Sequence, residues 1–458
     1  MDRETFLKQT AKLAGDYLQR EETLHPFQYR TPQQLQQHLD LEISEQGLSD
    51  EEFFSRLQAI METTPEVGSR RFFNQLFGGK CFPALSAEML SAVLNSSMYT
   101  FKAAGPHILI ERIVIERMIE KVGYSGAADG TFTPGGSLAN LVGMLLARNQ
   151  ADPASRERGV GRRMTAYASD ISHYSLVKAC GFMGVGRESL RKVDSDDLGR
   201  LDPEALRQAL KRDLKRGFLP FCVVATAGTT VLGSYDPLPE IADVCREYGL
   251  WMHVDAALGG SALLSSSYRH LLEGSQLSHS FAWNLHKMGG VPLSCSVLLV
   301  NRGGLLERCF NENADYLFQS EHDFNPGTKS LQCGRRNDAF KAWALWSYYG
   351  DSGMDQRITH LFQLAGYARR KVLDHPRLEL VKDIESVNVC FRVKEVDAVE
   401  LCDRLDRQGV LKVGYGDVEG ENVVRLPCVN SDLDEKDIDR FFDWLLEVAE
   451  SLSVGAPV

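Results

Sequence analysis

The chain has 458 residues, of which 43% are hydrophobic and 9% aromatic; this much apolar side chain excludes a disordered tail and a small disulfide-stapled scaffold. The 62 acidic residues outnumber the 51 basic ones, and the formal net charge of -11 argues against nucleic acid as the main partner, because a polyanion needs a basic face. The ten cysteines include no CxxC pair and have no histidine at zinc-ligand spacing, so we expect no metal site and buried free thiols in a reducing compartment.

Residues 1–20 show no secretory signal, because charges occur throughout them and no apolar core is present. No run of the sequence approaches the roughly 18 consecutive apolar residues that a membrane helix needs. We therefore expect a cytoplasmic protein with no membrane span.

The first 70 residues are predicted to form a helical segment. Apolar residues at helical spacing indicate its first helix, namely Phe6, Leu13, Ala14, Tyr17 and Leu18. Ser49 and Glu52 form a capping box ahead of a further helical run. A helix with one apolar stripe needs a partner, so we expect this segment to pack against the rest of the chain or against a second subunit.

Between residues 71 and 350, short apolar runs alternate with amphipathic helices, which is typical of a largely parallel sheet covered on both faces. Residues 219–226, 236–249 and 250–255 form one predicted strand, helix and strand unit. Further strands are predicted within residues 164–169, 278–284 and 293–300. This region is therefore expected to be a large α/β domain.

Residues 351–458 are predicted to form a smaller α+β domain. Its strands are expected at 388–393 and 423–429, and its closing helix within 434–452. The boundary is placed near residue 351, where Gly350 and Gly353 indicate a turn before a long helix.

Lys287 is the first candidate for chemistry. It follows an apolar strand and precedes Met288 and a pair of glycines. A nearly buried amine in this place could form a Schiff base with an aldehyde. The alternative is a solvated surface lysine.

Asp255 closes another apolar strand, 32 residues before Lys287. A carboxylate at the C-terminal edge of a parallel sheet points into the crevice where such folds bind ligands. It could pair with a protonated pyridine nitrogen and keep a cofactor ring electron-poor. The alternative is a helix N-cap.

Two further motifs fit the same crevice. Gly136 and Ser137 stand before the predicted helix 138–148, where backbone amides could hold a phosphate; an ordinary N-cap role for Ser137 is the alternative. His173 follows the strand 164–169 and could lie flat on a planar cofactor, or could be a hydrogen-bonded turn residue. Thr230 and Asp236 could reach the same crevice.

Five stretches occur in an order that is informative as a set: SHYS at 172–175, TAGTTVLGSYDP at 226–237, HVDAALGGSALLS at 253–265, NLHK at 284–287 and LQCGRR at 331–336. In this order they resemble the group II amino acid decarboxylases that depend on pyridoxal phosphate. The resemblance runs from about Arg71 to the C-terminus. It is strongest with the branch that acts on acidic amino acids, through FFNQLFGG at 72–79 and DGTFTPGGSLAN at 129–140.

The resemblance implies an α/β protein with the type I aminotransferase-like fold, in which a large, mostly parallel seven-stranded sheet forms the cofactor domain at 71–350. A smaller α+β domain would follow at 351–458, and residues 1–70 would be a helical dimerisation segment. The expected assembly is a homodimer with active sites at the subunit interface. The expected partner is a small amino acid substrate, with no nucleic acid and no membrane.

Roles follow from the resemblance residue by residue. Lys287 would form the Schiff base with pyridoxal 5'-phosphate, Asp255 would pair with the pyridine nitrogen, and His173 and Ala257 would sandwich the ring. The phosphate would be held by Gly136, Ser137, Asn284 and His286, and Thr230 and Asp236 would lie beside the ring. Arg425 would bind a substrate carboxylate.

The substrate end of the pocket would be shaped by Gln75, Phe77 and Ser97. A bulky Phe77 would shorten the pocket and favour a side chain one methylene shorter than that of glutamate. The expected reaction is α-decarboxylation of cysteine sulfinate, cysteate or aspartate to hypotaurine, taurine or β-alanine and CO2. Shape alone discriminates by only about 1 to 3 kcal/mol, so glutamate is an overlapping substrate. The alternative is that Phe77 is a packed core aromatic.

One departure from the family leaves the reaction type open. Many members carry a tyrosine before the LQCGRR motif that is thought to protonate the carbanion, whereas residues 321–330 here are EHDFNPGTKS. His322 is the candidate substitute as proton donor. The open alternatives are a decarboxylation-dependent oxidative deaminase, a decarboxylase of diaminobutyrate or an aromatic amino acid, and a non-enzymatic regulatory scaffold that kept the fold.

Overall fold

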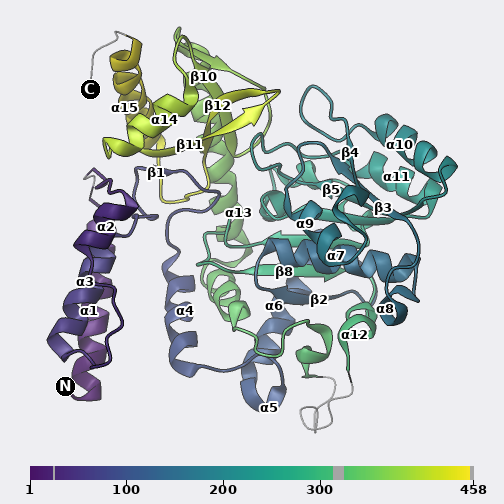
Figure 1. Cartoon of the computed structure of the whole chain (residues 1–458), viewed down its shortest axis with the longest axis horizontal. Coiled ribbons are helices and arrows are strands. Elements are labelled where there is room, and N and C mark those ends of the chain that lie inside the picture. The colour runs from purple at the N-terminus through teal and green to yellow at the C-terminus, as the bar shows by residue number, and fades with distance from the viewer. Residues whose placement is uncertain (24–25, 313–323, 454–458) are drawn as a thin grey trace. The chain divides into compact units, whose positions relative to one another are not determined.

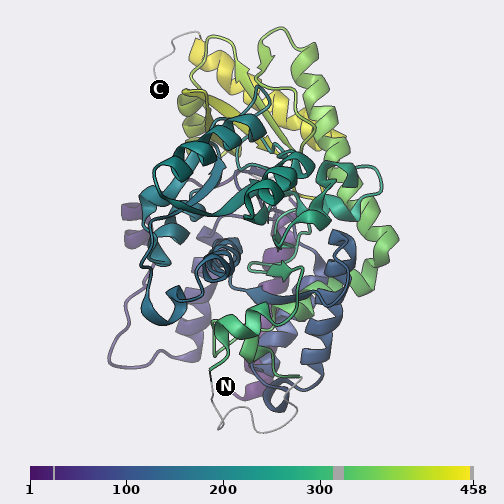
Figure 2. The ribbon, with the colours of Figure 1, turned by 90° about the vertical axis from the view of Figure 1, so that its right-hand side faces the viewer.

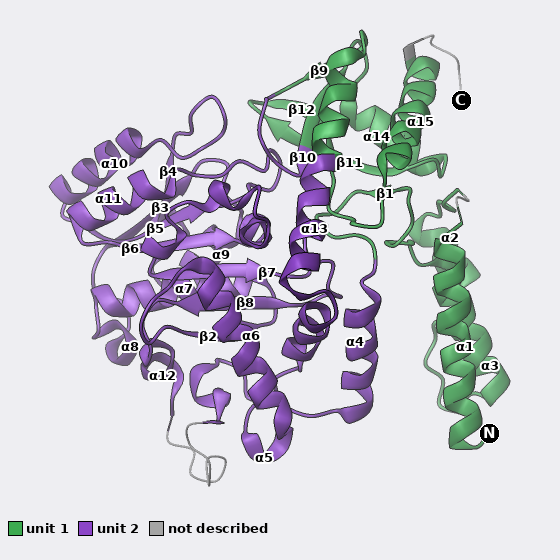
Figure 3. Ribbon diagram, turned by 180° about the vertical axis from the view of Figure 1, so that it is seen from behind, with its two compact units in different colours: residues 1–79, 364–381, 389–458 green, residues 80–363, 382–388 purple. Residues whose placement is uncertain are grey.

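The computed structural model describes residues 1–23, 26–312 and 324–453 (Figure 1). The chain divides into two compact units (Figure 3). The larger unit contains residues 80–363 and 382–388, and the smaller one contains residues 1–79, 364–381 and 389–458. This division differs from the three predicted parts, which are residues 1–70, 71–350 and 351–458. The role of residues 1–70 in dimerisation stays a prediction.

The larger unit is built on a sheet that has seven strands in the described part of the chain. In chain order they are β2 (Asp129–Thr133), β3 (Met164–Ser169), β4 (Leu190–Val193), β5 (Leu219–Thr226), β6 (Trp251–Ala256), β7 (Ser280–Asn284) and β8 (Ser296–Val300). Their spatial order is β2-β8-β7-β6-β5-β3-β4. Strands β4, β3, β5, β6 and β7 pair in parallel, and β8 is antiparallel to both of its neighbours. The predicted large, mostly parallel seven-stranded sheet is therefore confirmed.

Helices cover both faces of this sheet. The helices that pack on its strands are α6 (Pro106–Val122), α7 (Gly136–Ala151), α9 (Ser175–Phe182), α10 (Pro203–Lys215) and α11 (Leu238–Tyr248). The larger unit also contains α4 (Phe82–Leu94), α5 (Phe101–Ala104), α8 (Ser155–Arg158) and α12 (Leu305–Phe310). The period of two along β3 decides which face each helix meets. Met164, Ala166 and Ala168 pack with α7 and α9, whereas Tyr167 points the other way and donates to Asp213 of α10 at 2.8 Å.

The smaller unit has a five-stranded sheet in its described residues, in the order β1-β11-β12-β10-β9. Its elements are α1 (Arg3–Glu21), α2 (Pro32–His38), α3 (Asp50–Thr63), β1 (Phe72–Phe73), β9 (Leu378–Leu380), β10 (Asn388–Val393), α14 (Ala398–Arg407), β11 (Lys412–Val418), β12 (Glu421–Pro427) and α15 (Glu435–Ser453). The parallel pairing of β1 with β11 joins the N-terminal segment to the C-terminal part. The C-terminal strands and helices, coloured green to yellow, gather together in Figures 1 and 2.

Several predicted elements appear close to their predicted bounds. The strands at 164–169, 219–226 and 388–393 match β3, β5 and β10 residue for residue, and the capping box of Ser49 and Glu52 begins α3. The predicted turn near residue 351 is present as a break inside α13 (Asp338–Asp374), where Gly350 has a φ of 61°. Glycine allows this left-handed conformation at no steric cost, so the long helix can change direction there.

Within residues 1–23, 26–312 and 324–453, no helix combines the length and the hydrophobicity that crossing a bilayer requires.

Candidate active site

The predicted site residues of the larger unit gather where its parallel strands end. Asp255 is the fifth residue of β6, Asn284 is the last residue of β7, and His173 follows β3. The carboxyl ends of parallel strands meet at one edge of a sheet, where α/β folds place their ligands. The fold therefore brings together residues that lie more than a hundred positions apart in the sequence.

Lys287 lies in a tight turn directly after β7. Its backbone N–H donates to the carbonyl of Asn284 at 3.3 Å, and its own carbonyl accepts from Gly290 at 3.0 Å. The side chain is partly buried, and its positive charge lowers the pKa values of His173 and His286. Lys287 is thus close enough to both imidazoles to act on their protonation, which is not expected of a solvated surface lysine.

Asp255 is 5% exposed and has partners for both carboxylate oxygens. Oδ2 accepts from Nδ2 of Asn140 at 2.7 Å, and Oδ1 accepts from the backbone N–H of Ala257 at 3.2 Å. The residue lies inside a strand, and the next helical turn begins only at Gly259. The alternative that Asp255 is a helix N-cap is therefore wrong, and its carboxylate is available to orient a ligand.

His173 is partly buried at the start of α9. Its Nδ1 lies 2.8 Å from the Ser175 hydroxyl. Burial lowers the pKa of His173, the negative charge of Asp255 acts against this, and the charges of Lys287 and Lys178 lower the pKa further. These effects favour a neutral imidazole at neutral pH, and they show that Asp255, Lys287 and His173 share one electrostatic environment.

The N-terminus of α7 forms an anion cradle against Asn284. The helix is preceded by Gly135, which has a φ of 126° and no side-chain cap, so the N-cap alternative for Ser137 is wrong. Ser137 is exposed in the first turn, where backbone amides have no intrahelical acceptor. A Cβ atom on Gly136 would lie 2.6 Å from Nδ2 of Asn284. Glycine thus keeps the space in front of the Asn284 amide open.

Asn284 gives a second indication that this part of the site binds a ligand. It is 3% exposed, and its Oδ1 has no hydrogen-bond partner among the residues that the structure describes. A buried amide oxygen without a partner is costly, so it indicates a group that the protein alone does not supply. Together with the helix amides, the Asn284 amide fits a phosphate group.

His286 is buried and held by the loop that follows Lys287. Its Nδ1 accepts from the backbone N–H of Cys295 at 3.0 Å, and burial lowers its pKa to about 4. The imidazole is therefore neutral. Nδ1 also lies 3.0 Å from the carbonyl oxygen of Cys295, and the tautomer with the proton on Nε2 is the one that lets Nδ1 accept from the Cys295 N–H. An N–H on Nε2 can donate to a phosphate oxygen.

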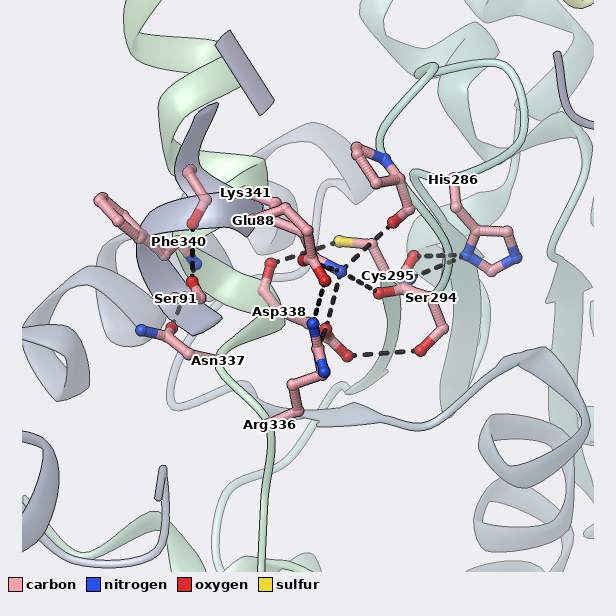
Figure 4. Close-up of polar contacts among 12 residues, drawn as sticks. Glu88, Ser91, His286, Ser294, Cys295, Arg336, Asn337, Asp338, Phe340 and Lys341 are labelled. Carbon is pink, nitrogen blue, oxygen red and sulfur yellow. Dashed lines mark hydrogen bonds and ion pairs between the residues drawn. The ribbon is translucent and has the colours of Figure 1, made fainter. Parts of the chain in front are cut away.

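The same loop is fastened by a buried lysine, Lys341 of α13 (Figure 4). Its Nζ donates to the carbonyls of Ser294 at 2.7 Å and Pro292 at 3.2 Å. It also forms ion pairs with Asp338 at 2.9 Å and with Glu88 at 3.0 Å. This cluster joins α4 and α13 to the segment that carries Lys287 and His286.

Thr230 and Asp236 belong to the loop after β5. Both oxygens of Asp236 accept backbone N–H groups, from Leu201 at 2.8 Å and Thr226 at 2.7 Å. Burial raises the pKa of Asp236 to about 7, against the lowering effect of these two bonds. The carbonyl of Thr230 accepts from Asn388 at 3.2 Å. Asp236 therefore fixes the shape of this loop. Ala257 lies buried directly after the neighbouring strand, β6.

The predicted substrate residues fall in different parts of the chain. Ser97 belongs to the larger unit and is partly buried between α4 and α5, whereas Gln75, Phe77 and Arg425 belong to the smaller unit. Within that unit, Arg425 donates to the carbonyl of Asn74 at 2.5 Å. The residue preceding Gln75 is thus in direct contact with the predicted carboxylate-binding arginine. His322 lies outside the described residues.

Residues 32–394 match the sequence model of the pyridoxal-dependent decarboxylase conserved domain. The chain belongs to this family. A human protein named cysteine sulfinic acid decarboxylase is 38% identical over 93% of this chain and 91% of its own length. A mouse protein named acidic amino acid decarboxylase GADL1 is 36% identical over 93% of this chain and 81% of its own. The crystal structure of mouse CSAD has a TM-score of 0.93 at 36% identity, and covers 97% of this chain and 98% of that one.

Membership of the pyridoxal-dependent decarboxylase family confirms several predictions. The chain has the predicted fold class, is an amino acid decarboxylase and uses pyridoxal phosphate. The site fits this cofactor: the cradle in front of Gly136 and the unpartnered oxygen of Asn284 suit the phosphate, and buried Asp255 suits the pyridine nitrogen.

The sequence analysis of this decarboxylase missed three polar residues beside the site, namely Asn140, Ser175 and His253. Asn140 and Ser175 bond directly to Asp255 and His173, respectively, and His253 bonds to Asn140 at 3.0 Å. A signal for Asn140 was present, because it is a polar residue within the apolar helical run that follows Gly136. Its partners could not be read from the sequence.

Proposed function

We propose that this chain α-decarboxylates a short acidic L-amino acid, namely cysteine sulfinate, cysteate or aspartate. The products would be hypotaurine, taurine or β-alanine, with CO2. The observation that carries this proposal is the 38% identity to human cysteine sulfinic acid decarboxylase over 93% of the chain. The relative whose name describes an acidic amino acid decarboxylase supports the same substrate class.

In this proposal the larger unit holds the cofactor. Lys287 would bind it through its amine, Asp255 would orient the ring nitrogen, and His173 and Ala257 would contact the ring. The phosphate is held by Gly136, Ser137, Asn284 and His286, with Thr230 and Asp236 at the ring edge. When bound, pyridoxal phosphate supplies an electron-poor ring that takes up the electron pair left behind by CO2.

The protein's own groups supply charge and protons around this chemistry. The carboxylate of Asp255 favours the protonated form of a ring nitrogen placed against it, because opposite charges attract strongly at a buried site. The neutral imidazole of His173 avoids placing a second positive charge beside Lys287. His322 remains the candidate donor of the proton that replaces CO2.

Substrate recognition is assigned to Gln75, Phe77, Ser97 and Arg425. Burial lowers the pKa of Arg425, but a guanidinium stays charged at neutral pH and presents paired N–H donors to a carboxylate. Its hydrogen bond to the Asn74 carbonyl fixes Arg425 beside the segment that carries Phe77. The ring centroid of Phe77 lies 6.2 Å from that of Phe72. A cation of β12 held beside the segment that carries a bulky aromatic suits a short, negatively charged side chain.

The test is a competition assay. The purified protein with added pyridoxal phosphate receives cysteine sulfinate, cysteate, aspartate, glutamate, diaminobutyrate and tyrosine together, and mass spectrometry identifies the products. Hypotaurine, taurine or β-alanine as the main product supports the proposal. A main product of γ-aminobutyrate, diaminopropane or tyramine, or aldehydes in place of amines, would overturn it.

Shortening Phe77 is expected to change the preference in a defined direction. Phe77→Ser should raise the ratio of γ-aminobutyrate to hypotaurine by about tenfold, because a methylene in a fitted pocket is worth roughly 1 to 3 kcal/mol. The product ratio from an equimolar mixture of glutamate and cysteine sulfinate measures the effect. Phe77→Trp, which enlarges the side chain, is the control and should not raise the ratio. A Phe77→Ser ratio equal to that of the wild type would assign Phe77 to packing alone.

We further propose a homodimer with the active sites at its interface, in which the N-terminal segment 1–70 takes part. Helix α4 supports the homodimer, because large apolar side chains are exposed along it and a second chain could cover them. They are Phe82, Met89, Leu90, Val93 and Leu94, and Val93 is 77% exposed. Sedimentation equilibrium is expected to give twice the chain mass for the wild type and a lower mass for Val93→Glu. A monomeric wild type would contradict the proposal.

A cytoplasmic location is part of the same proposal. All ten cysteines lie in the described part of the chain and are free thiols, and eight of them are buried. Free thiols are typical of proteins in a reducing compartment.

A further inference from the structure

A continuous chain of buried hydrogen bonds crosses the larger unit behind the site. Trp251 Nε1 donates to the Ser280 hydroxyl at 2.8 Å, and that hydroxyl lies 2.8 Å from Nδ1 of His253. The other ring nitrogen of His253, Nε2, lies 3.0 Å from Oδ1 of Asn140. These hydrogen bonds thus run from strand β6 to β7, return to β6 at His253, and then reach helix α7 at Asn140.

Asn140 divides this chain into two branches at the site. Its Nδ2 donates to Oδ2 of Asp255 at 2.7 Å and to the Ser175 hydroxyl at 3.1 Å. The Ser175 hydroxyl lies 2.8 Å from Nδ1 of His173, and the backbone N–H of Ser175 donates to the same Nδ1 at 3.3 Å. One amide group therefore contacts both Asp255 and the residue that holds His173.

The direction of the first bonds follows from the groups themselves. A carboxylate can only accept, so the NH2 of Asn140 must face Asp255 and its Oδ1 must face His253. Nε2 of His253 therefore carries a proton. Burial lowers the pKa of His253 to about 4, so its ring is neutral and Nδ1 accepts from the Ser280 hydroxyl.

The direction at His173 follows in the same way. The backbone N–H of Ser175 can only donate, so Nδ1 of His173 must accept. The Ser175 hydroxyl accepts from Asn140 and gives its own proton to the same Nδ1. The proton of the neutral His173 ring is therefore on Nε2.

The residues of this hydrogen-bond chain are closed to water and tightly packed. Asn140 and Ser175 are 1% exposed, and His253 and Ser280 are 0% exposed. Gly143 lies one turn after Asn140 on α7, and a Cβ atom there would lie 2.6 Å from the His253 ring. With no water to replace a lost partner, each bond in the chain is costly to break.

We propose that Asn140 is a positioning residue that sets the orientation of Asp255 and, through the Ser175 hydroxyl, helps to hold the His173 ring in place. The inference rests on the proposed function, because it assumes that Asp255 and His173 contact the cofactor. Asn140 leaves the remaining lone pairs of Asp255 for the ring nitrogen. Through the Ser175 hydroxyl it adds a second bond to Nδ1 of His173, beside that of the Ser175 backbone N–H, so that Nε2 keeps its donor N–H toward the site.

Asn140→Asp tests both branches, because the variant keeps the shape and loses both donor hydrogens. Loss of a hydrogen bond to a charged group typically weakens binding by about 10- to 100-fold. We therefore expect the dissociation constant of pyridoxal phosphate to rise by about this factor. The absorption spectrum of the bound cofactor should also respond differently to pH. Asn149→Asp makes the same chemical change on the same helix, where Asn149 contacts Arg148 and Cys309, and should leave both readouts unchanged.

Ser175→Ala separates the two branches, because it cuts the link to His173 and leaves the Asn140 bond to Asp255. Cofactor affinity should stay at the wild-type value, while the KM for cysteine sulfinate rises by about three- to tenfold, the size expected for one neutral hydrogen bond. This variant also decides the question if Asn140→Asp fails to fold. Wild-type cofactor affinity in Asn140→Asp, or an unchanged KM in Ser175→Ala, would overturn the inference. A wild-type protein that decarboxylates no acidic amino acid would instead overturn the proposed function.

Discussion

Replacing Lys287 by alanine is expected to abolish decarboxylation. Lys287 comes directly after β7, and its charge acts on both His173 and His286. Loss of a covalent group of this kind lowers the rate by about 10³-fold or more. Product formation from cysteine sulfinate, followed by mass spectrometry, measures the loss.

The same variant has a readout that does not depend on turnover. Alanine cannot form a Schiff base, so the bound cofactor should be removed by dialysis and the visible absorption should be lost. Lys211→Ala is the control, because Lys211 is exposed on α10, and it should keep both activity and colour. Retention of more than about a tenth of the activity by Lys287→Ala would remove Lys287 from the mechanism.

Much of the sheet and the order of the site motifs could be predicted from the sequence. The strands at 164–169 and 219–226 are mostly apolar runs with almost no charged or exposed residue, a pattern typical of buried parallel strands. Asp255 and Lys287 then follow from their places at strand ends. Local pattern was sufficient here because each signal lies within one element.

The features that sequence reasoning missed depend on contacts between distant residues. Asn140 and Asp255 are 115 positions apart, and nothing local to either residue indicates that they meet. Likewise, residues 1–79 group with 389–458 through contacts between distant residues, among them the pairing of β1 with β11 and the ion pair of Arg70 with Asp437. Ser137 was an N-cap candidate by residue type, but Gly135 occupies that position because its φ of 126° suits glycine.

Replacing Lys341 by methionine is expected to destabilise the protein strongly. The side chain is 0% exposed, and its ammonium group faces Asp338, Glu88 and the carbonyls of Pro292 and Ser294 (Figure 4). Removing one partner of a buried ion pair costs about 3 to 5 kcal/mol, because the remaining charges are left without compensation. Urea unfolding of the cofactor-loaded protein measures the change. Lys211→Met is the control for the same substitution at an exposed site.

The protonation of this cluster makes the prediction specific to neutral pH. Burial alone would lower the pKa of Lys341, but Asp338 and the other acidic neighbours raise it above its ordinary value. Burial raises the pKa of Asp338, and Lys341 opposes that rise. A lysine whose pKa is raised in the folded state stabilises below the unfolded pKa, and this contribution is lost as the pH rises through the folded pKa. The difference between Lys341→Met and wild type should therefore shrink in alkaline solution, where Lys341 loses its proton, and in acidic solution, where Asp338 takes one up.

A triple variant distinguishes lost charge pairing from lost packing. Combining Lys341→Met with Glu88→Gln and Asp338→Asn removes the two carboxylate charges that Lys341→Met deprives of their buried partner. Arg336, which also pairs with Glu88 and Asp338, keeps its charge at an exposed position. The triple variant should recover part of the stability, since neutral amides cost less to bury than carboxylates that have lost their buried cation. The carbonyls of Ser294 and Pro292 would still lack their donor, so the loop after Lys287 should stay loosened and cofactor affinity should recover less than stability. Equal stability of Lys341→Met and Lys211→Met would show that the cluster does not hold this loop.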